Sequence, residues 1–249
     1  MGRASGRALC VRAPRLYLGA APGRITRLSS RFDLSTFWGR LRAYLDFIFT
    51  DHAFLRVTWH NAHWISPELL RMNQPWPYQL AQWKKRGIKT VLNLRGTPDA
   101  GHYVLEEEAC RKLGLKLVNF TVWSREAPSR EVVLGAKRLF DTLEYPVLMH
   151  CKSGADRAGI MSVLYQHFRQ GLPVKEAARQ LSWKYGHARA GLTGVLDYAI
   201  ERYLEEADAL GHSYEEWVSR PDYDHKAIKQ EFRASWWGTL LTEKLLRRE

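Results

Sequence analysis

The octapeptide HCKSGADR, residues 150–157, combines a thiol, small residues and an arginine at a spacing suited to holding one phosphate group. Cys151 follows an apolar run, Gly154 lies in the expected turn and Arg157 opens the next apolar segment. A loop that leaves a strand and enters a helix N-terminus directs backbone N–H groups and the positive end of the helix dipole toward an anion. Arg157 can also hold two phosphate oxygens at once, which lysine cannot do. The octapeptide therefore predicts an anion-binding loop.

Cys151 is the candidate nucleophile of this loop. A free thiol with a pKa of about 8.5 is only a few per cent thiolate at neutral pH, whereas values of about 4 to 7 occur at helix N-termini near cations. The other cysteines, Cys10 and Cys110, have no arginine at the same offset. The spacing thus predicts a thiolate that accepts a phosphoryl group. The alternative is a buried structural cysteine followed by a solvated arginine.

Composition limits the kinds of protein that this chain can be. Its 249 residues are 45% hydrophobic, enough for one core of ordinary size. The 3 cysteines form no CxxC pair and no cluster with histidine, so we expect no disulfide framework, no metal and no cofactor. No apolar run reaches the roughly 18 residues that span a bilayer. We expect a cytoplasmic protein, either soluble or peripheral at the membrane.

The charge balance favours anionic partners. The chain has 38 basic and 26 acidic residues, a net charge of +12, which suits phosphates, acidic lipids or nucleic acid. The first 31 residues carry seven arginines and no acidic residue, as in an arginine-rich targeting segment or a disordered extension. We expect no nucleic-acid binding, because the aromatic residues do not interleave with basic ones and no recognition motif is present.

Alternating strand and helix patterns predict an α/β fold with a mostly parallel central sheet flanked by helices. Strands are predicted at 88–94, 115–122 and 146–150, between helices at 78–87, 103–114 and 129–144. After the loop, helical segments are predicted at 157–171, 173–186, 192–211 and 224–247. Residues 34–49 have apolar side chains at three- and four-residue steps, which predicts an amphipathic helix that needs a partner surface.

These patterns suggest one catalytic domain with an extension at each end. The predicted organisation is a basic tail at 1–33, an amphipathic helical extension at 34–59, the catalytic domain at 60–215 and a C-terminal amphipathic helix at 216–249.

The sequence HCKSGADR followed by Ala158 and a glycine resembles the His-Cys-x5-Arg loop of cysteine-based protein tyrosine and dual-specificity phosphatases. The resemblance covers about residues 60–215, and the position of the loop after several βα units is similar to the dual-specificity type. The segments GIKTVLNLRG and HCKSGADRAG resemble a bacterial branch of phosphatase-like proteins, found in alphaproteobacteria and implicated in removing phosphate from lipid A.

The resemblance implies roles for individual loop residues. Cys151 is the implied nucleophile, Arg157 the ligand of the phosphate and the transition state, and a cysteinyl-phosphate is the intermediate that water hydrolyses. His150 is implied to support the cysteine. The residues implied to surround the phosphate are Lys152, Ser153, Gly154, Ala155 and Ala158.

The general acid departs from the family pattern. Family members usually supply an aspartate upstream of the cysteine, but between Glu108 and Glu131 the only acidic residue is Glu126. Asp156 resembles the myotubularin lipid phosphatases, whose loop also has an aspartate before the arginine. Arg125 favours the charged form of Glu126, which is unsuited to an acid. We prefer Asp156 as the acid; its alternative role is a helix N-cap, and that of Glu126 is a surface charge.

Three further positions bear on turnover and substrate. Ala158 stands where the family commonly has a serine or threonine that assists breakdown of the intermediate, which predicts slow turnover. Lys152 has a counterpart in phosphoinositide phosphatases related to the tensin homologue, which suggests a polyphosphorylated or lipid head group; otherwise it points to solvent. Arg95 ends a strand at the ligand-binding edge of a parallel sheet, so it contacts substrate or forms a structural salt bridge.

The predicted activity is hydrolysis of a phosphomonoester in a phosphorylated lipid or sugar-lipid. The alternatives are a protein tyrosine or dual-specificity phosphatase and a weakly active phosphate-binding module. Near the C-terminus, Ile228, Phe232, Trp236 and Leu240 recur four residues apart. Such a helix lies in an anionic membrane interface or packs on the catalytic domain.

Overall fold

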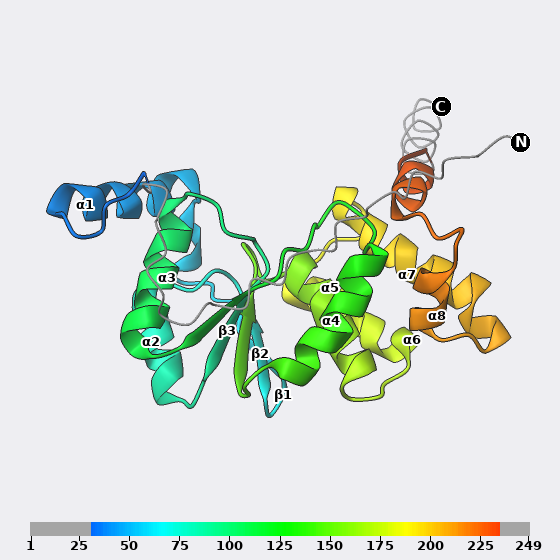
Figure 1. The fold of residues 1–249 in the computed structure, drawn as a ribbon. Helices are drawn as coiled ribbons and strands as arrows, with labels where there is room; N and C mark the ends of the chain where they lie inside the picture. The colour runs from blue at the N-terminus through cyan, green and yellow to red at the C-terminus, as the bar shows by residue number, and fades with distance from the viewer. Residues whose placement is uncertain (1–30, 235–249) are drawn as a thin grey trace, which may run out of the picture.

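A five-stranded sheet forms the centre of the computed structural model, which describes residues 31–234 (Figure 1). The strand order is β1-β2-β5-β3-β4, and only β1 is antiparallel to its neighbour. The strands are β1 His63–Ser66, β2 Leu69–Met72, β3 Thr90–Asn93, β4 Lys116–Asn119 and β5 Val147–His150. The predicted α/β fold with a mostly parallel sheet is confirmed.

The strand that leads into the cysteine loop is the central one. β5 lies between β2 and β3 and is buried along its whole length, which is why its sequence is a continuous apolar run. The carboxyl ends of β2, β3, β4 and β5 therefore meet at one edge of the sheet. Ligands of open α/β sheets bind at this edge.

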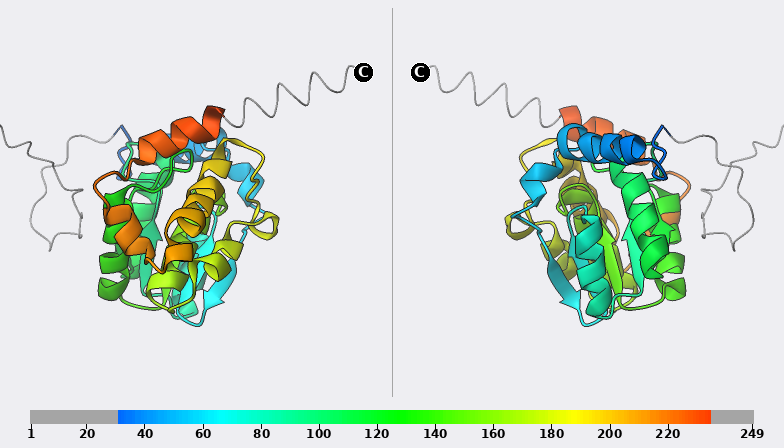
Figure 2. Two further views of the ribbon diagram at one scale, coloured as in Figure 1. Left: turned by 90° about the vertical axis from the view of Figure 1, so that its right-hand side faces the viewer. Right: turned by 90° about the vertical axis from the view of Figure 1, so that its left-hand side faces the viewer.

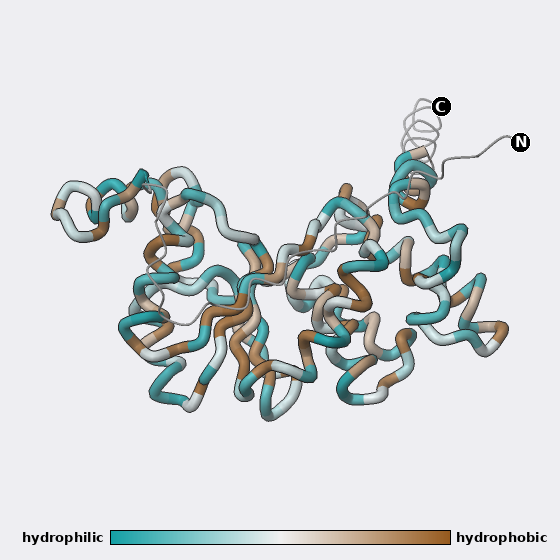
Figure 3. Tube along the Cα trace, in the orientation of Figure 1, coloured by the Kyte–Doolittle hydropathy of each residue, from teal (hydrophilic) through white to brown (hydrophobic). Residues whose placement is uncertain are grey.

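Helices cover both faces of the sheet (Figure 1). On one face lie α2 Pro77–Lys85 and α3 Gly101–Leu113, packed on a cluster that includes Leu70, Val91 and Leu148. On the other lie helices whose side chains join Leu92 and Met149 in the larger core. These are α4 Arg130–Thr142, α5 Asp156–Phe168, α6 Val174–Ala177, α7 Val195–Glu206 and α8 Tyr214–Ser219. Hydropathy follows the same layers, since the tube is brown along the strands and mixed along the helices (Figure 3).

The N-terminal extension is a helical segment that packs on α3. It consists of α1 Phe37–Leu45, a π-helical turn at Asp46–Thr50 and a 3-10 turn at Ala53–Arg56. Arg40 forms a bidentate ion pair with Glu108 of α3, and the backbone N–H of Gly101 donates to Asp46 Oδ2 at 2.7 Å.

The two ends of the described chain lie on the same side of the molecule. Figure 2 shows α1 and the last described helical residues, 225–234, at the edge where the parallel strands end. The remainder of the predicted C-terminal helix, including Trp236 and Leu240, and most of the predicted basic tail lie outside the described residues. Within residues 31–234 no helix is long and apolar enough to cross a membrane.

Candidate active site

The loop of residues 151–155 joins the end of β5 to the start of α5, as the sequence predicts. Cys151 is 2% exposed, and the backbone N–H of Gly154 donates to its Sγ at 3.2 Å. A hydrogen bond to sulfur stabilises negative charge on it. Gly154 has φ +74°, and a Cβ there would lie 2.7 Å from the backbone of Met72. Only glycine fits, because the conformation is left-handed and the end of β2 packs directly against the loop.

The carbonyl oxygens of loop residues 152–155 accept hydrogen bonds from outside the loop. The oxygen of Lys152 accepts the N–H of Gln74 at 3.3 Å, and the oxygen of Ser153 accepts the side-chain amide of Asn61 at 2.9 Å. The next two oxygens, of Gly154 and Ala155, accept the same guanidinium nitrogen of a buried arginine at 2.8 and 2.9 Å. With its carbonyl groups turned outward, the loop presents N–H groups on the opposite, concave side, which is the arrangement of an anion cradle.

That buried arginine is Arg71 of β2, which sequence reasoning missed. Its other guanidinium nitrogen donates to the backbone and side-chain oxygens of Gln180, both at 2.9 Å, and the group stacks on Tyr185. Burial lowers the pKa of Arg71 to about 10, so it remains a cation at neutral pH. Arg71 therefore adds positive charge beneath the cradle while it holds the backbone. A lone arginine within the apolar stretch LLRM was the available signal.

Arg157 is the second residue of α5 and is partly exposed. Among residues 31–234 it has no hydrogen-bond or ion-pair partner, in contrast to Arg71 and Arg95. Its guanidinium is thus available to a ligand bound in the cradle. Ala158, next along the helix, is fully buried and supplies no hydroxyl group to the loop.

Asp156 belongs to a three-residue ionic cluster. His187 Nδ1–H donates to Asp156 Oδ1 at 2.8 Å, and His187 Nε2–H donates to Asp197 Oδ2 of α7 at 2.7 Å. The imidazole is 1% exposed. Burial by itself lowers the pKa of His187, but the bonds to the two carboxylates outweigh it and raise the pKa to about 9. His187 is therefore protonated at neutral pH and donates to both acidic side chains.

The alternative role weighed for Asp156 in the sequence is wrong. Asp156 is the first residue of α5 and not its N-cap, which is Ala155, and its carboxylate binds His187 instead of a helix N–H. Sequence reasoning missed His187 and Asp197, because nothing in the local pattern marks a histidine that reaches two carboxylates on other segments.

A buried carboxylate from the N-terminal extension lies beside the loop. Asp51 binds Arg95 through both oxygens, at 2.5 and 3.1 Å, and also binds Arg56. Lys152 Nζ lies 3.7 Å from Asp51 Oδ1. Burial opposes the charge of Asp51, but the hydrogen bond from Arg95 and the nearby cations hold its pKa below the usual range. The structural ion pair weighed for Arg95 is thus present, with Gln74 as an additional acceptor at 2.8 Å.

His150 ends β5 in a buried polar environment. Its Nε2 lies 2.6 Å from a carboxylate oxygen of Glu106 in α3, without the alignment of a hydrogen bond. Nearby, burial lowers the pKa of His102 to about 3, with Arg95 acting in the same direction, so His102 is neutral. Both side chains are buried on the side of the sheet that α3 covers.

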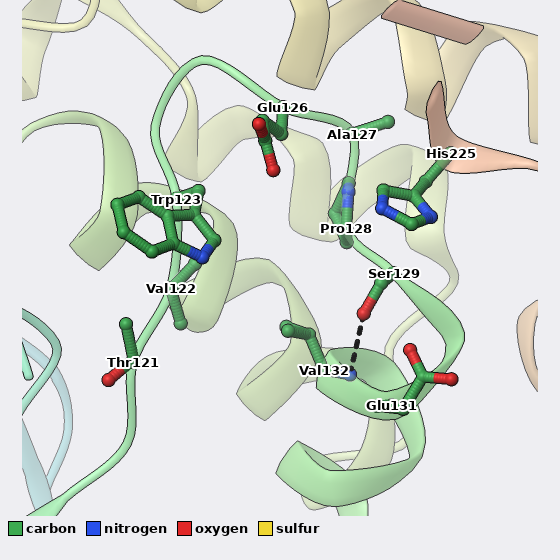
Figure 4. Close-up of a pocket in the computed structure, with 10 residues that line it drawn as sticks. All are labelled: Thr121, Val122, Trp123, Glu126, Ala127, Pro128, Ser129, Glu131, Val132 and His225. Atoms are coloured by element: carbon green, nitrogen blue, oxygen red, sulfur yellow. Dashed lines mark hydrogen bonds between the residues drawn. The ribbon is translucent and has the colours of Figure 1, made fainter. Parts of the chain in front are cut away.

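Glu126 lies on the segment between β4 and α4, and its ion-pair partner belongs to the last helix. Its carboxylate pairs with Lys229 of the last helix at 2.8 Å and lines a hollow together with Trp123 and His225 (Figure 4). The residues that line this hollow include neither Cys151 nor Arg157. The structure thus places Asp156 at the loop and Glu126 against the C-terminal helix.

A family model described as "DSP-PTPase phosphatase fused to NAD+ Kinase" matches residues 69–191, the stretch that holds β2 to β5, the loop and His187. Over residues 69–191 the chain thus matches the cysteine-based tyrosine and dual-specificity phosphatase superfamily. No curated protein matches it.

Solved structures of this superfamily resemble the chain at low identity. P. aeruginosa TpbA is 21% identical over 65% of this chain and 92% of its own, with a TM-score of 0.48. Tk-PTP in its active form is 22% identical over 61% of this chain and 99% of its own, with a TM-score of 0.46. Human DUSP28 is 13% identical over 61% of this chain and 95% of its own, with a TM-score of 0.43.

Proposed function

We propose that this protein is a cysteine-dependent phosphomonoester hydrolase that works through a cysteinyl-phosphate intermediate. The observation that carries the proposal is the loop itself. Its carbonyl oxygens are bonded outward, its N–H at Gly154 already reaches Cys151 Sγ, and Arg157 has no protein partner within residues 31–234. Such a cradle binds the three non-bridging oxygens of a phosphoryl group and stabilises the charge that develops on them.

In the first proposed step, Cys151 Sγ attacks phosphorus. The S–P bond forms, the P–O bond to the leaving group breaks, and the leaving oxygen receives a proton from Asp156. In the second step, water attacks phosphorus, the S–P bond breaks, and Asp156 accepts the proton of the water.

The proposed substrate is a phosphorylated lipid or sugar-lipid, with removal of phosphate from lipid A as the specific case that the sequence suggests. Three observations support this class. Lys152 is 42% exposed at the mouth of the loop, where it can meet a second phosphate. The net charge is +12. The segments that flank the family-matched stretch, at residues 31–60 and 225–234, both lie on the side of the loop (Figure 2).

Phosphate release from p-nitrophenyl phosphate, phosphorylated lipids and phosphotyrosine or phosphoserine peptides tests the proposal under reducing conditions. The Cys151→Ser variant should lose activity on every substrate, whereas Cys110→Ala should keep it, because Cys110 is buried in α3 away from the loop. Preference for lipids supports the proposed substrate, and preference for peptides indicates a protein phosphatase. A wild-type protein that binds vanadate but releases no phosphate would refute the enzyme and leave a phosphate-binding module.

A further inference from the structure

The N-terminal extension exposes an unusual number of large apolar side chains. Phe37 and Trp38 are 73% and 68% exposed, although both lie within the regular helix α1. We call this set the apolar ridge; its members are Phe37, Trp38, Leu41, Leu45, Phe49, Phe54, Leu55, Val57 and Trp59. Scattered single apolar residues are normal on a surface, but a group that is this dense along one short segment marks an interaction site.

The side chains of the ridge on α1 point away from the rest of the protein. α1 meets α3 through buried Ala43 and through Arg40, which pairs with Glu108, while buried Gly39 packs on Asp33 just before the helix. The contact is close, because a Cβ added at Gly101 of α3 would lie 2.1 Å from the carbonyl oxygen of Ala43. The opposite side of the same helix carries Phe37, Trp38, Leu41 and Leu45. With the domain-facing side already packed, these large side chains have no further place to pack among residues 31–234.

The ridge ends beside the cysteine loop. Trp59 accepts a hydrogen bond on its carbonyl oxygen from Asn73. Its ring lies next to Gly186, where an added Cβ would be 3.2 Å from the Trp59 ring and 3.9 Å from the side chain of Ala155. Asp51, from the same extension, contacts Arg95 of the site. The last residue of the ridge therefore lies beside the cysteine loop.

The charge next to the ridge selects an anionic partner. Residues 1–30, which lead directly into the extension, contain six arginines and no acidic residue. Within α1, Arg42 is exposed and has no ion-pair partner among residues 31–234. Segments that lie in the interface of an acidic bilayer are rich in tryptophan, phenylalanine and leucine and are flanked by arginine.

We propose that the apolar ridge inserts into the interfacial layer of an anionic membrane. If the proposed function holds, this orientation presents the Cys151 loop to phosphate groups at the membrane surface. The cradle holds one phosphate group and does not itself bind lipid. The ridge provides the contact with the lipid surface. Insertion depends on apolar area, and the attraction that precedes it depends on salt concentration.

Flotation with vesicles tests the ridge on the full chain. The wild type should float with phosphatidylcholine vesicles that contain phosphatidylglycerol, and poorly with phosphatidylcholine alone. The double variant Trp38→Ser/Phe49→Ser should lower the partition coefficient roughly 30-fold, because two aromatic side chains no longer enter the interface. The matched control is Leu210→Ser, which removes a 73% exposed apolar residue from the turn between α7 and α8. It should float like the wild type.

Three results would overturn the proposal. The first is a wild type that does not float, and the second is a double variant that floats as well as the wild type. The third is a wild-type dimer, detected by light scattering, that is absent in the double variant; the ridge would then cover a second copy. Activity on p-nitrophenyl phosphate separates this proposal from the proposed function. The double variant should retain that activity, and a chain that floats but releases no phosphate would refute the hydrolase while the membrane surface stands.

Discussion

Replacing His187 by glutamine tests the charge of the cluster that it forms with Asp156 and Asp197. Glutamine keeps a hydrogen-bond donor but cannot carry the proton. Raising the pKa of His187 from 6.5 to about 9 corresponds to about 3 kcal/mol of folding free energy at 1.36 kcal/mol for each pKa unit. Because the folded pKa is the higher one, this contribution is complete below about pH 6.5 and is lost as the pH rises through about 9.

The measurement is urea denaturation of both proteins at several pH values from about 6 to about 10, over the range in which the linkage acts. Other titrating groups are shared and cancel in the difference between wild type and His187→Gln. That difference should be largest at the acidic end and shrink by about 3 kcal/mol at the alkaline end. Asp197→Asn removes one of the two partners of His187. Its difference in stability from the wild type should therefore change less with pH than that of His187→Gln. A difference that is constant with pH would show that folded His187 is neutral and refute the ionic cluster.

Three other substitutions probe the loop and its supports. Asp51→Asn leaves two buried arginines without their counter-charge and should lower the free energy of unfolding by about 3 to 5 kcal/mol in urea denaturation. Gly154→Ala should weaken vanadate binding, measured by calorimetry, at least tenfold, because the added Cβ meets the backbone of β2. The control Gly171→Ala also has a positive φ, +71°, but open space around it. It should bind vanadate normally and lose about 1 kcal/mol of stability. Ala158→Ser should raise the steady-state rate relative to the burst of the first turnover; an unchanged rate would contradict the proposed role of the missing hydroxyl.

Local patterns predicted three of the four strands that pair in parallel. The predicted strands at 88–94, 115–122 and 146–150 contain β3, β4 and β5. β3 and β5 are buried on both faces, and such strands are apolar runs between turn signals. The β1–β2 hairpin was not predicted. β1 has four residues and a half-exposed edge, and the charge of Arg71 interrupts the apolar pattern of β2.

The predicted helix at 173–186 is wrong for a tertiary reason. α6 covers only Val174–Ala177, followed by 3-10 turns, and Leu181 has ψ +82°, outside the helical region. Arg71 binds the carbonyl oxygen of Gln180, which a continuous helix would use itself. Helical propensity gave no sign of this, because the competing donor comes from a strand more than a hundred positions earlier in the chain.

The cysteine loop was predictable because its chemistry is contiguous, whereas its supports are not. The family-matched stretch is 69–191, yet Asn61 and Asp51 precede it and Asp197 follows it. Each contacts the loop or a residue bound to it. A fragment limited to the matched stretch would leave the carbonyl oxygen of Ser153 without its amide donor, Arg95 without its carboxylate and His187 with one partner. The extensions are therefore part of the machinery that shapes the cradle, and the same N-terminal extension carries the apolar ridge.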